Sequence, residues 1–146
     1  MTETEDLTFR DADPDDVEWI AAMLSDEGYP AGASDVARRL DRFTVPGSVI
    51  RVAEREEAPL GFVACHLLPR LERDDPVARV IALVVDAGAR ERGVGAALLA
   101  EAERIARGAG AAFVEVTSGH HRPEATRLYE HAGFDPTLTT YLRKRL

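Results

Sequence analysis

Hydrophobic residues in the first third of the chain repeat at helical spacing in two segments. A short strand is expected at residues 7–10, and Asp13 followed by Pro14 then predicts a helix start, because aspartate caps helices and proline fits their first position. Apolar residues recur at intervals of three and four over residues 17–24 and again over 36–43. This spacing predicts two helices joined by an acidic loop.

From residue 48 the pattern changes to β-branched and apolar runs separated by polar turns. Three strands of an antiparallel meander are expected there, at residues 49–54, 60–68 and 78–85. A helix, a strand, a helix and a last strand follow, at residues 94–106, 112–117, 125–132 and 138–143. This order predicts an α/β fold in a single domain over residues 1–146, with one mixed sheet covered by helices on both faces.

Composition narrows the class of protein. No apolar run reaches the about 18 residues of a membrane span and the N-terminus is acidic, so we expect a cytoplasmic protein without a membrane partner. The net charge of −8 argues against general nucleic-acid binding, because phosphates require a basic surface. The single cysteine, Cys65, lies in an apolar run and is expected to be a buried thiol. The chain is compatible with a homodimer.

Charge and histidine spacing add two further constraints. Residues 1–77 carry 18 acidic and 8 basic side chains, whereas residues 78–146 carry 8 and 10. The acidity therefore lies in the first half, which indicates either a different ligand for each half or a more solvated first half. The four histidines show no HExxH or facial-triad spacing, so no metal site is expected.

A glycine-rich turn joins the strand at 78–85 to the next helix. Gly93 and Gly95 stand where that helix begins, beside Arg90 and Arg92. Glycines permit close backbone approach, and the first N–H groups of a helix attract anions, so a phosphate or pyrophosphate is the expected ligand. The turn lacks the GxxxxGK(S/T) motif of a Walker loop. It has Leu98 in the third glycine position of a Rossmann fingerprint, and too few βα units follow. A glycine-tightened turn with solvated arginines is the structural alternative.

Two motifs in register resemble the GNAT superfamily of N-acetyltransferases. The segment R-x-x-G-x-G at 90–95 is similar to the family's (Q/R)-x-x-G-x-(G/A) coenzyme A signature, and EATRLYEHAGF at 124–134 resembles its A-x-x-L-Y-E-x-x-G-F block. The close resemblance covers about residues 78–134. It implies a GNAT-like fold, acetyl-CoA as cosubstrate and transfer of the acetyl group to a primary amine.

The resemblance also implies where acetyl-CoA binds. The pyrophosphate is expected on the backbone amides of the glycine turn, and the pantetheine arm along the end of the preceding strand, where two central strands of the family splay apart. The implied cofactor-binding residues are Leu83, Val84, Val85, Arg90, Glu91, Arg92, Gly93, Val94, Gly95 and Ala96.

The catalytic residues follow less directly. Tyr129 matches the family tyrosine near the cofactor sulfur and is expected to be the general acid, with simple packing on its helix as the alternative. The strand glutamate that many relatives carry has no counterpart before the glycine turn. His66 is therefore the candidate base, because its intrinsic pKa lies near 6.5. Glu115, His120 and His121 are alternatives.

The first helices and their loop generally build the acceptor pocket in this family. Here the implied substrate-binding residues are Asp26, Glu27 and Tyr29, whose carboxylates and ring favour a small cationic amine. Surface hydration is the alternative role for this acidity. Arg122 replaces an asparagine that contacts the pantetheine arm in many relatives. Acetylation of a protein or peptide amine and a non-catalytic acyl-CoA-binding module remain the alternative functions.

Overall fold

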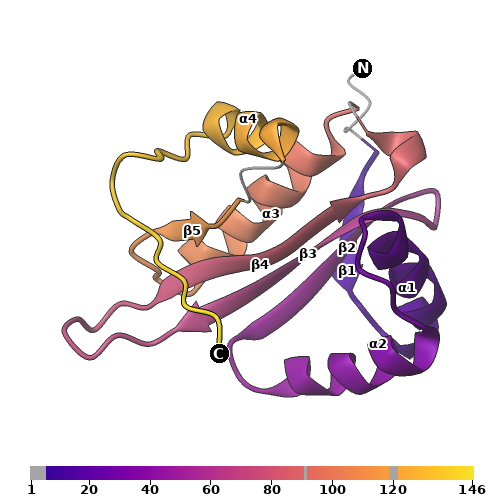
Figure 1. Ribbon diagram of the computed structural model, residues 1–146, viewed down its shortest axis with the longest axis horizontal. Coiled ribbons are helices and arrows are strands. Elements are labelled where there is room, and N and C mark those ends of the chain that lie inside the picture. The colour runs from indigo at the N-terminus through magenta and orange to yellow at the C-terminus, as the bar shows by residue number, and fades with distance from the viewer. Residues whose placement is uncertain (1–5, 91, 119–121) are drawn as a thin grey trace.

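One mixed sheet of five strands forms the centre of the protein (Figure 1). The computed structural model describes residues 6–90, 92–118 and 122–146. The strands lie side by side in chain order: β1 (Thr8–Asp11), β2 (Ser48–Arg55), β3 (Ala58–Leu68), β4 (Val77–Val85) and β5 (Val114–Val116). The first four are antiparallel, which confirms the predicted meander, and β5 runs parallel to β4.

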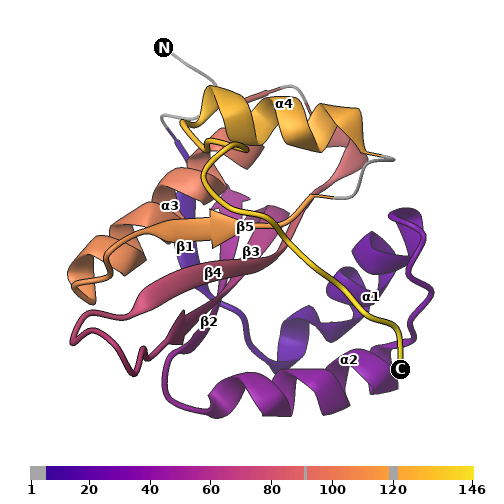
Figure 2. The same ribbon diagram turned by 60° about the vertical axis from the view of Figure 1, so that its left-hand side comes forward.

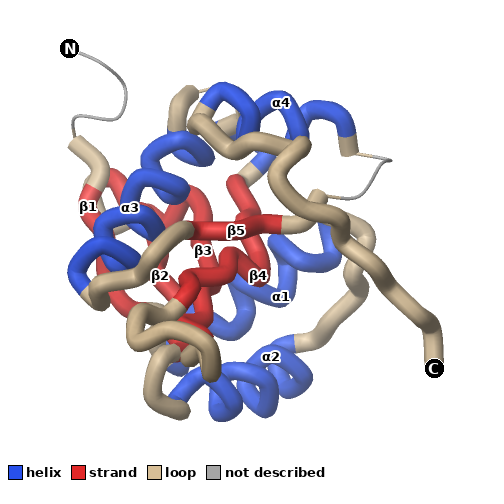
Figure 3. The backbone as a smooth tube through the Cα atoms, turned by 90° about the vertical axis from the view of Figure 1, so that its left-hand side faces the viewer, coloured by secondary structure: helices blue, strands red, loops and turns tan. Residues whose placement is uncertain are grey.

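Two helices cover each face of this sheet (Figure 3). On one face lie α1 (Val17–Asp26) and α2 (Ala33–Leu40), and on the other lie α3 (Val94–Gly108) and α4 (Pro123–His131). Short 3-10 turns at Pro14–Asp16, Asp41–Thr44 and Ala87–Ala89 join the elements. The predicted α/β fold with helices on both faces is confirmed.

Alternating side chains of β3 divide the hydrophobic core into two parts. Phe62 packs with Ile20 of α1 on one face, whereas Val63 and Cys65 pack with α3 on the other, because successive strand residues point to opposite sides. Cys65 is 3% exposed, and burial raises the pKa of its thiol to about 11. The prediction of a buried, unreactive thiol is therefore confirmed.

The sheet opens between β4 and β5. These strands pair over three residues only, from Ala78↔Val114 to Val80↔Val116, although β4 continues to Val85. On the opposite edge of β4 the register with β3 shifts so that Ile81 has no partner, which makes it a β-bulge. The bulge lies immediately beyond the last β4–β5 pair.

The predicted last strand at residues 138–143 is wrong. The chain after α4 is a coil that passes in front of the sheet (Figure 2). Leu138 and Leu142 are 79% and 85% exposed, so the leucines of this segment do not pack against the sheet. The Asp135 carboxylate instead accepts hydrogen bonds from the backbone N–H and hydroxyl of Thr137, which favours a turn.

Candidate active site

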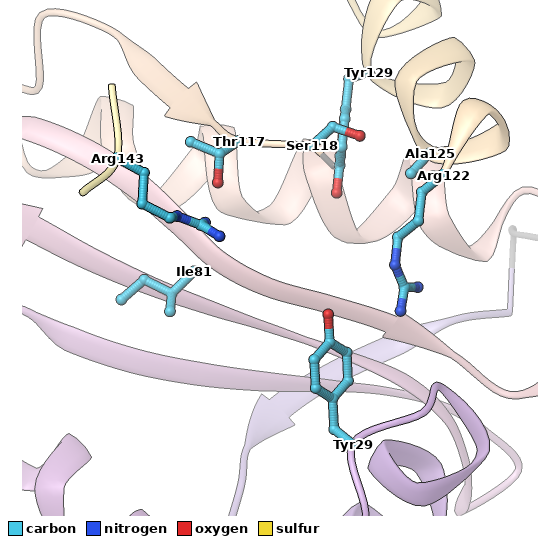
Figure 4. Close-up of a pocket in the computed structure, with 8 residues that line it drawn as sticks. All are labelled: Tyr29, Ile81, Thr117, Ser118, Arg122, Ala125, Tyr129 and Arg143. Carbon is cyan, nitrogen blue, oxygen red and sulfur yellow. The ribbon is translucent and has the colours of Figure 1, made fainter. Parts of the chain in front are cut away.

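A cavity of about 290 Å³ lies where β4 and β5 separate (Figure 4). Its walls come from the loop after α1, the bulge of β4, the end of β5, the start and middle of α4, and the C-terminal coil. The lining residues are Tyr29, Ile81, Thr117, Ser118, Arg122, Ala125, Tyr129 and Arg143. The fold thus brings together side chains from position 29 to position 143 of the sequence.

The backbone of β4 is open toward this cavity, whereas most of its side chains are committed to the core. Val84 is buried among the α1 residues, and Leu83 and Val85 pack against the α3 core. Beyond Val80 no described residue of β5 pairs with β4. Leu83, Val84 and Val85 therefore have a strand edge available for a ligand's amides, as the resemblance implies, while their side chains have a structural role.

Tyr129 reaches the cavity from α4, and its hydroxyl points into it (Figure 4). The ring also packs edge-on against Phe134, with the centroids 5.9 Å apart, so Tyr129 combines the packing and cavity positions that the sequence left open. Burial raises the pKa of the Tyr129 phenol, against the opposing effect of the Arg122 charge. The phenol is therefore protonated at neutral pH and is able to donate a proton.

The turn before α3 has the features of an anion site. Gly93 is the N-cap of α3 with φ of 82°, in the left-handed region that favours glycine, and no described side chain caps this end. The first N–H groups of the 15-residue helix α3 and its positive dipole end therefore face outward. Arg92 and Ala96 are exposed beside them, whereas the side chain of Val94 is buried in the core.

Gly95 has a packing role in addition to the cofactor-binding role predicted from the sequence. A Cβ atom at this position would lie 3.0 Å from Cδ2 of Leu128 on α4 and 3.8 Å from Cγ2 of Val85. Gly95 therefore allows α3 to pack closely against the helix that carries Tyr129. Glu91, another predicted member of the turn, lies outside the described residues.

Glu27 joins three parts of the site through its charge. Its Oε1 lies 2.6 Å from Nη2 of Arg90 in the cofactor turn, and its Oε2 lies 2.5 Å from Nη1 of Arg122 at the start of α4. Arg122 also donates to the backbone carbonyl of Glu27 at 2.9 Å and stacks over the ring of Tyr29 at 5.5 Å. The carboxylate predicted to attract the substrate is thus neutralised by two arginines.

The remaining candidates in the described part of the chain do not line the cavity. The Nδ1 of His66 and the hydroxyl of Ser48 share a hydrogen bond of 2.6 Å. His66 is not among the described residues that line the cavity. Glu115 pairs with Arg79 at 3.0 Å, and Asp26 is exposed at the end of α1. His120 and His121, also considered for the base, fall outside the described residues.

Two lining residues had no signal in the sequence. Ile81 is recognisable as a bulge only from the strand register, because an additional residue leaves the hydrophobic composition of a strand unchanged. Arg143 lies in a segment predicted to be a strand, and nothing in its local pattern connects it with β4 or α4. Thr117 and Ser118 were not predicted as site residues either, although a polar pair directly after a strand is a signal that could have indicated them.

Two further classes of site, a metal centre and a membrane-spanning helix, find no support in the described parts of the chain. No group of three or more metal-ligating side chains occurs in residues 6–90, 92–118 and 122–146. Within the same ranges, every helix is too short or too polar to cross a membrane.

Comparison with known proteins identifies the family. The sequence profile of the acetyltransferase (GNAT) family matches residues 9–134, which is most of the chain, and the protein therefore belongs to this family. Members of the family are enzymes that use acetyl-CoA. A search of curated proteins found no match.

Solved structures agree with the fold. A transcriptional regulator from Bacillus halodurans C-125 superimposes with a TM-score of 0.87 at 23% identity, over 96% of this chain and 99% of that one. An aminoglycoside acetyltransferase from an uncultured soil metagenomic sample gives 0.79 at 16% identity, over 99% of both chains. Glucosamine-6-phosphate N-acetyltransferase from Arabidopsis thaliana gives 0.77 at 15% identity, over 96% of this chain and 99% of that one.

Proposed function

We propose that this protein transfers the acetyl group of acetyl-CoA to a primary amine of a small molecule, in the cavity between β4 and β5. The observation that carries the proposal is the hydroxyl of Tyr129, which points into a cavity bounded by the open part of β4. Membership of an acetyltransferase family supplies the class of reaction. The cavity of about 290 Å³ has room for a small acceptor.

The cofactor-binding residues fit an anionic, extended ligand. The exposed N-terminus of α3 at Gly93 suits a pyrophosphate, and the β4 edge at residues 83–85 suits the amides of a pantetheine arm. Arg92 adds positive charge at the turn. When bound there, acetyl-CoA supplies the thioester that activates the acetyl group. Membership of the family and this geometry support cofactor binding at α3 independently of catalysis.

Tyr129 is the proposed general acid. Its raised pKa keeps the phenol protonated, so that the hydroxyl can donate to a departing thiolate. The base is harder to assign, since the described lining residues include neither a carboxylate nor a histidine. His66 as the base stays a prediction. Because its Nδ1 is bonded to Ser48 and it is not among the described lining residues, we propose that the amine loses its proton to water. The rate is then expected to rise with pH as more of the amine becomes neutral.

The fold does not determine the class of acceptor, which depends on the side chains that line the cavity in this protein. Neighbours with the same fold are named for aminoglycosides and for glucosamine 6-phosphate, so the fold admits acceptors of opposite charge. The sequence-based proposal of a cationic amine rests on Asp26 and Tyr29 alone once Glu27 is paired with arginines. The cytoplasm remains the predicted location.

The test is release of coenzyme A with a panel of small primary amines, using the wild type and Tyr129→Phe. The variant is expected to bind acetyl-CoA normally and to turn over about 10²-fold more slowly, because positioned proton transfer contributes about 10² to 10⁴ and a thiolate leaves easily. Tyr141→Phe, on the exposed C-terminal coil, is the matched control with unchanged turnover. Binding of acetyl-CoA without coenzyme A release from any amine would establish the non-catalytic module instead.

A further inference from the structure

The described lining of the cavity carries positive charge. Arg122 and Arg143 are the charged members of the described lining, and no carboxylate accompanies them there. Glu27, the nearest acid tied to the site, directs both oxygens of its carboxylate to Arg90 and Arg122. The single negative charge of Glu27 faces the two positive charges of Arg90 and Arg122, which leaves one positive charge in excess. Arg143 adds a second positive charge to the described lining of the cavity.

The two arginines differ in how they are held. Arg122 is fixed by two hydrogen bonds to Glu27 and by the ring of Tyr29. Arg143 comes from the C-terminal coil, and its partner in the described part of the chain is the ring of Tyr141, with the Arg143 Cζ 5.6 Å from the centroid. Its guanidinium points into the cavity from the side opposite Arg122 (Figure 4). Arg143 therefore has hydrogen-bond donors available for a ligand.

We propose that Arg143 binds an anionic group of the acceptor, a carboxylate or a phosphate on the molecule that carries the amine. This inference rests on the proposed function and specifies its acceptor. A guanidinium forms two parallel hydrogen bonds with either anion, which fixes orientation as well as adding affinity. The hydroxyl of Thr117, which lines the same cavity and is drawn above the guanidinium in Figure 4, is a further donor for the same group.

The arrangement also orients the acceptor. With its anion at Arg143, the molecule reaches across the cavity toward the hydroxyl of Tyr129, where the amine meets the acyl group, and Ile81 lines the same cavity near Arg143. Ile81 is 54% exposed because it occupies the bulge of β4, so an apolar part of the acceptor can cover it. The acceptor is then a short molecule with an amine at one end and an anion at the other.

Arg143 as a ligand of the coenzyme A phosphates is the competing assignment. The anion site of the cofactor turn lies at the N-terminus of α3, where Gly93, Arg90 and Arg92 are placed, and Arg143 is not part of it. The two assignments predict different kinetic effects, because a cofactor contact changes the KM for acetyl-CoA and an acceptor contact changes the KM for the amine.

The experiment compares acceptors that differ in the anion: β-alanine with propylamine, and glucosamine 6-phosphate with glucosamine. The wild type is expected to favour the anionic member of at least one pair by about tenfold or more in kcat/KM, since hydrogen bonds between charged groups are strong. Arg143→Gln is expected to bring that ratio close to one by raising the acceptor KM, with the KM for acetyl-CoA unchanged. Arg145→Gln, an exposed arginine two residues further on, is the matched control and keeps the ratio.

Equal kcat/KM within both pairs for the wild type would overturn the inference and leave the proposed function intact. So would a rise in the KM for acetyl-CoA in Arg143→Gln without a change in acceptor preference. If no amine is acetylated, the proposed function fails, and thermal stabilisation by the anionic members then tests the anion site. Stabilisation that disappears in Arg143→Gln supports the site, and equal stabilisation of wild type and variant excludes it.

Discussion

The two edges of β4 show how this sheet combines stability with a ligand site. Toward β3 the strand forms eight residue pairs, from Gly61↔Val85 to Leu68↔Val77, interrupted only at the bulge of Ile81. Toward β5 it forms three. We call the paired strands β1–β4 with their two cores the closed half. The open half is the unpaired edge of β4 beyond Val80 together with the cofactor turn at Gly93, β5 and α4. Backbone groups hold the closed half together, whereas in the open half those of β4 remain for a ligand.

The same strand is nevertheless anchored along its whole length by side chains. Val80 and Val84 are both buried, one on each side of the bulge, and they belong to different cores. Opening one edge therefore does not loosen the strand. The difference between the halves predicts that substitutions in the closed half lower stability without changing ligand binding, and that those in the open half change ligand binding at a smaller cost in stability.

Gly61→Ala is expected to give the largest loss of stability. A Cβ atom at Gly61 would lie 2.8 Å from the Val84 carbonyl oxygen and 3.1 Å from Cδ1 of Leu98, and the backbone oxygen cannot move without disturbing the β3–β4 ladder. We expect the free energy of unfolding to fall by about 2 to 3 kcal/mol, as for other overpacked sites. Urea denaturation measures it. Gly108→Ala, with no atom within 4 Å of its Cβ position, is the control, and equal effects of the two substitutions would contradict the closed-half argument.

Asp16→Asn is expected to cost about 1.5 to 2 kcal/mol at neutral pH, because charge-assisted hydrogen bonds contribute about this much. Both Asp16 oxygens accept from Arg10, at 2.7 and 2.8 Å, and Oδ2 also accepts from the backbone N–H of Asp13. These contacts, led by Arg10, hold the pKa of Asp16 below its usual value. They confirm the predicted helix start at Asp13 and tie it to β1.

The sign of the pH dependence follows from that lowered pKa. The stabilisation by Asp16 is fully present above the unfolded-state value of about 3.9 and is lost as the pH falls through the lower folded-state value. Wild type and Asp16→Asn should therefore converge in stability below about pH 4, as followed by urea denaturation at several pH values. Asp15→Asn, an exposed neighbour, serves as the control. A stability difference that persists in strong acid would show that packing, not charge, is responsible.

Gly93→Ala tests the open half. Its φ of 82° strains any residue with a Cβ, so we expect a loss of about 1 kcal/mol in stability together with weaker binding of acetyl-CoA at the N-terminus of α3. Gly110→Ala is matched to it, since Gly110 has φ of 72° beyond the other end of the same helix. Calorimetric titration should show weaker binding for Gly93→Ala only. Weaker binding for both would mean that strain in α3, rather than the anion site, is the cause.

The sequence predicted the closed half better than the open half. Runs of apolar residues identify β2, β3 and β4, and helical spacing identifies α1 and α3, because each of these elements buries a continuous face. The strand expected at 138–143 shows the limit of this argument. Its leucines and tyrosine fit a strand, but β5 is only three residues long and the segment remains exposed.

The candidate site was predictable where a motif fixes the backbone and unpredictable where long side chains meet. The glycine turn and Tyr129 lie at the places that the two motifs indicate. In contrast, Glu27 reaches Arg90 and Arg122 across 63 and 95 residues, so no local pattern reveals that its charge is neutralised. Arg143 likewise enters the site through the path of a coil, which depends on tertiary packing alone.

Glu27→Gln is expected to have the smallest effect and to separate two roles for this residue. Its partners Arg90 and Arg122 are 48% and 32% exposed, so the ion pairs contribute no more than about 1 kcal/mol to stability. The carboxylate also competes with the cofactor phosphates for Arg90, and its removal should strengthen acetyl-CoA binding about two- to threefold, as charge removal near an anion does. Calorimetric titration of Glu27→Gln against Asp26→Asn, the exposed acid beside it, measures the difference. A weaker affinity in Glu27→Gln alone would show that Glu27 instead holds Arg90 in position for the phosphates, so that the loop after α1 would act as a support of the cofactor turn rather than as its competitor.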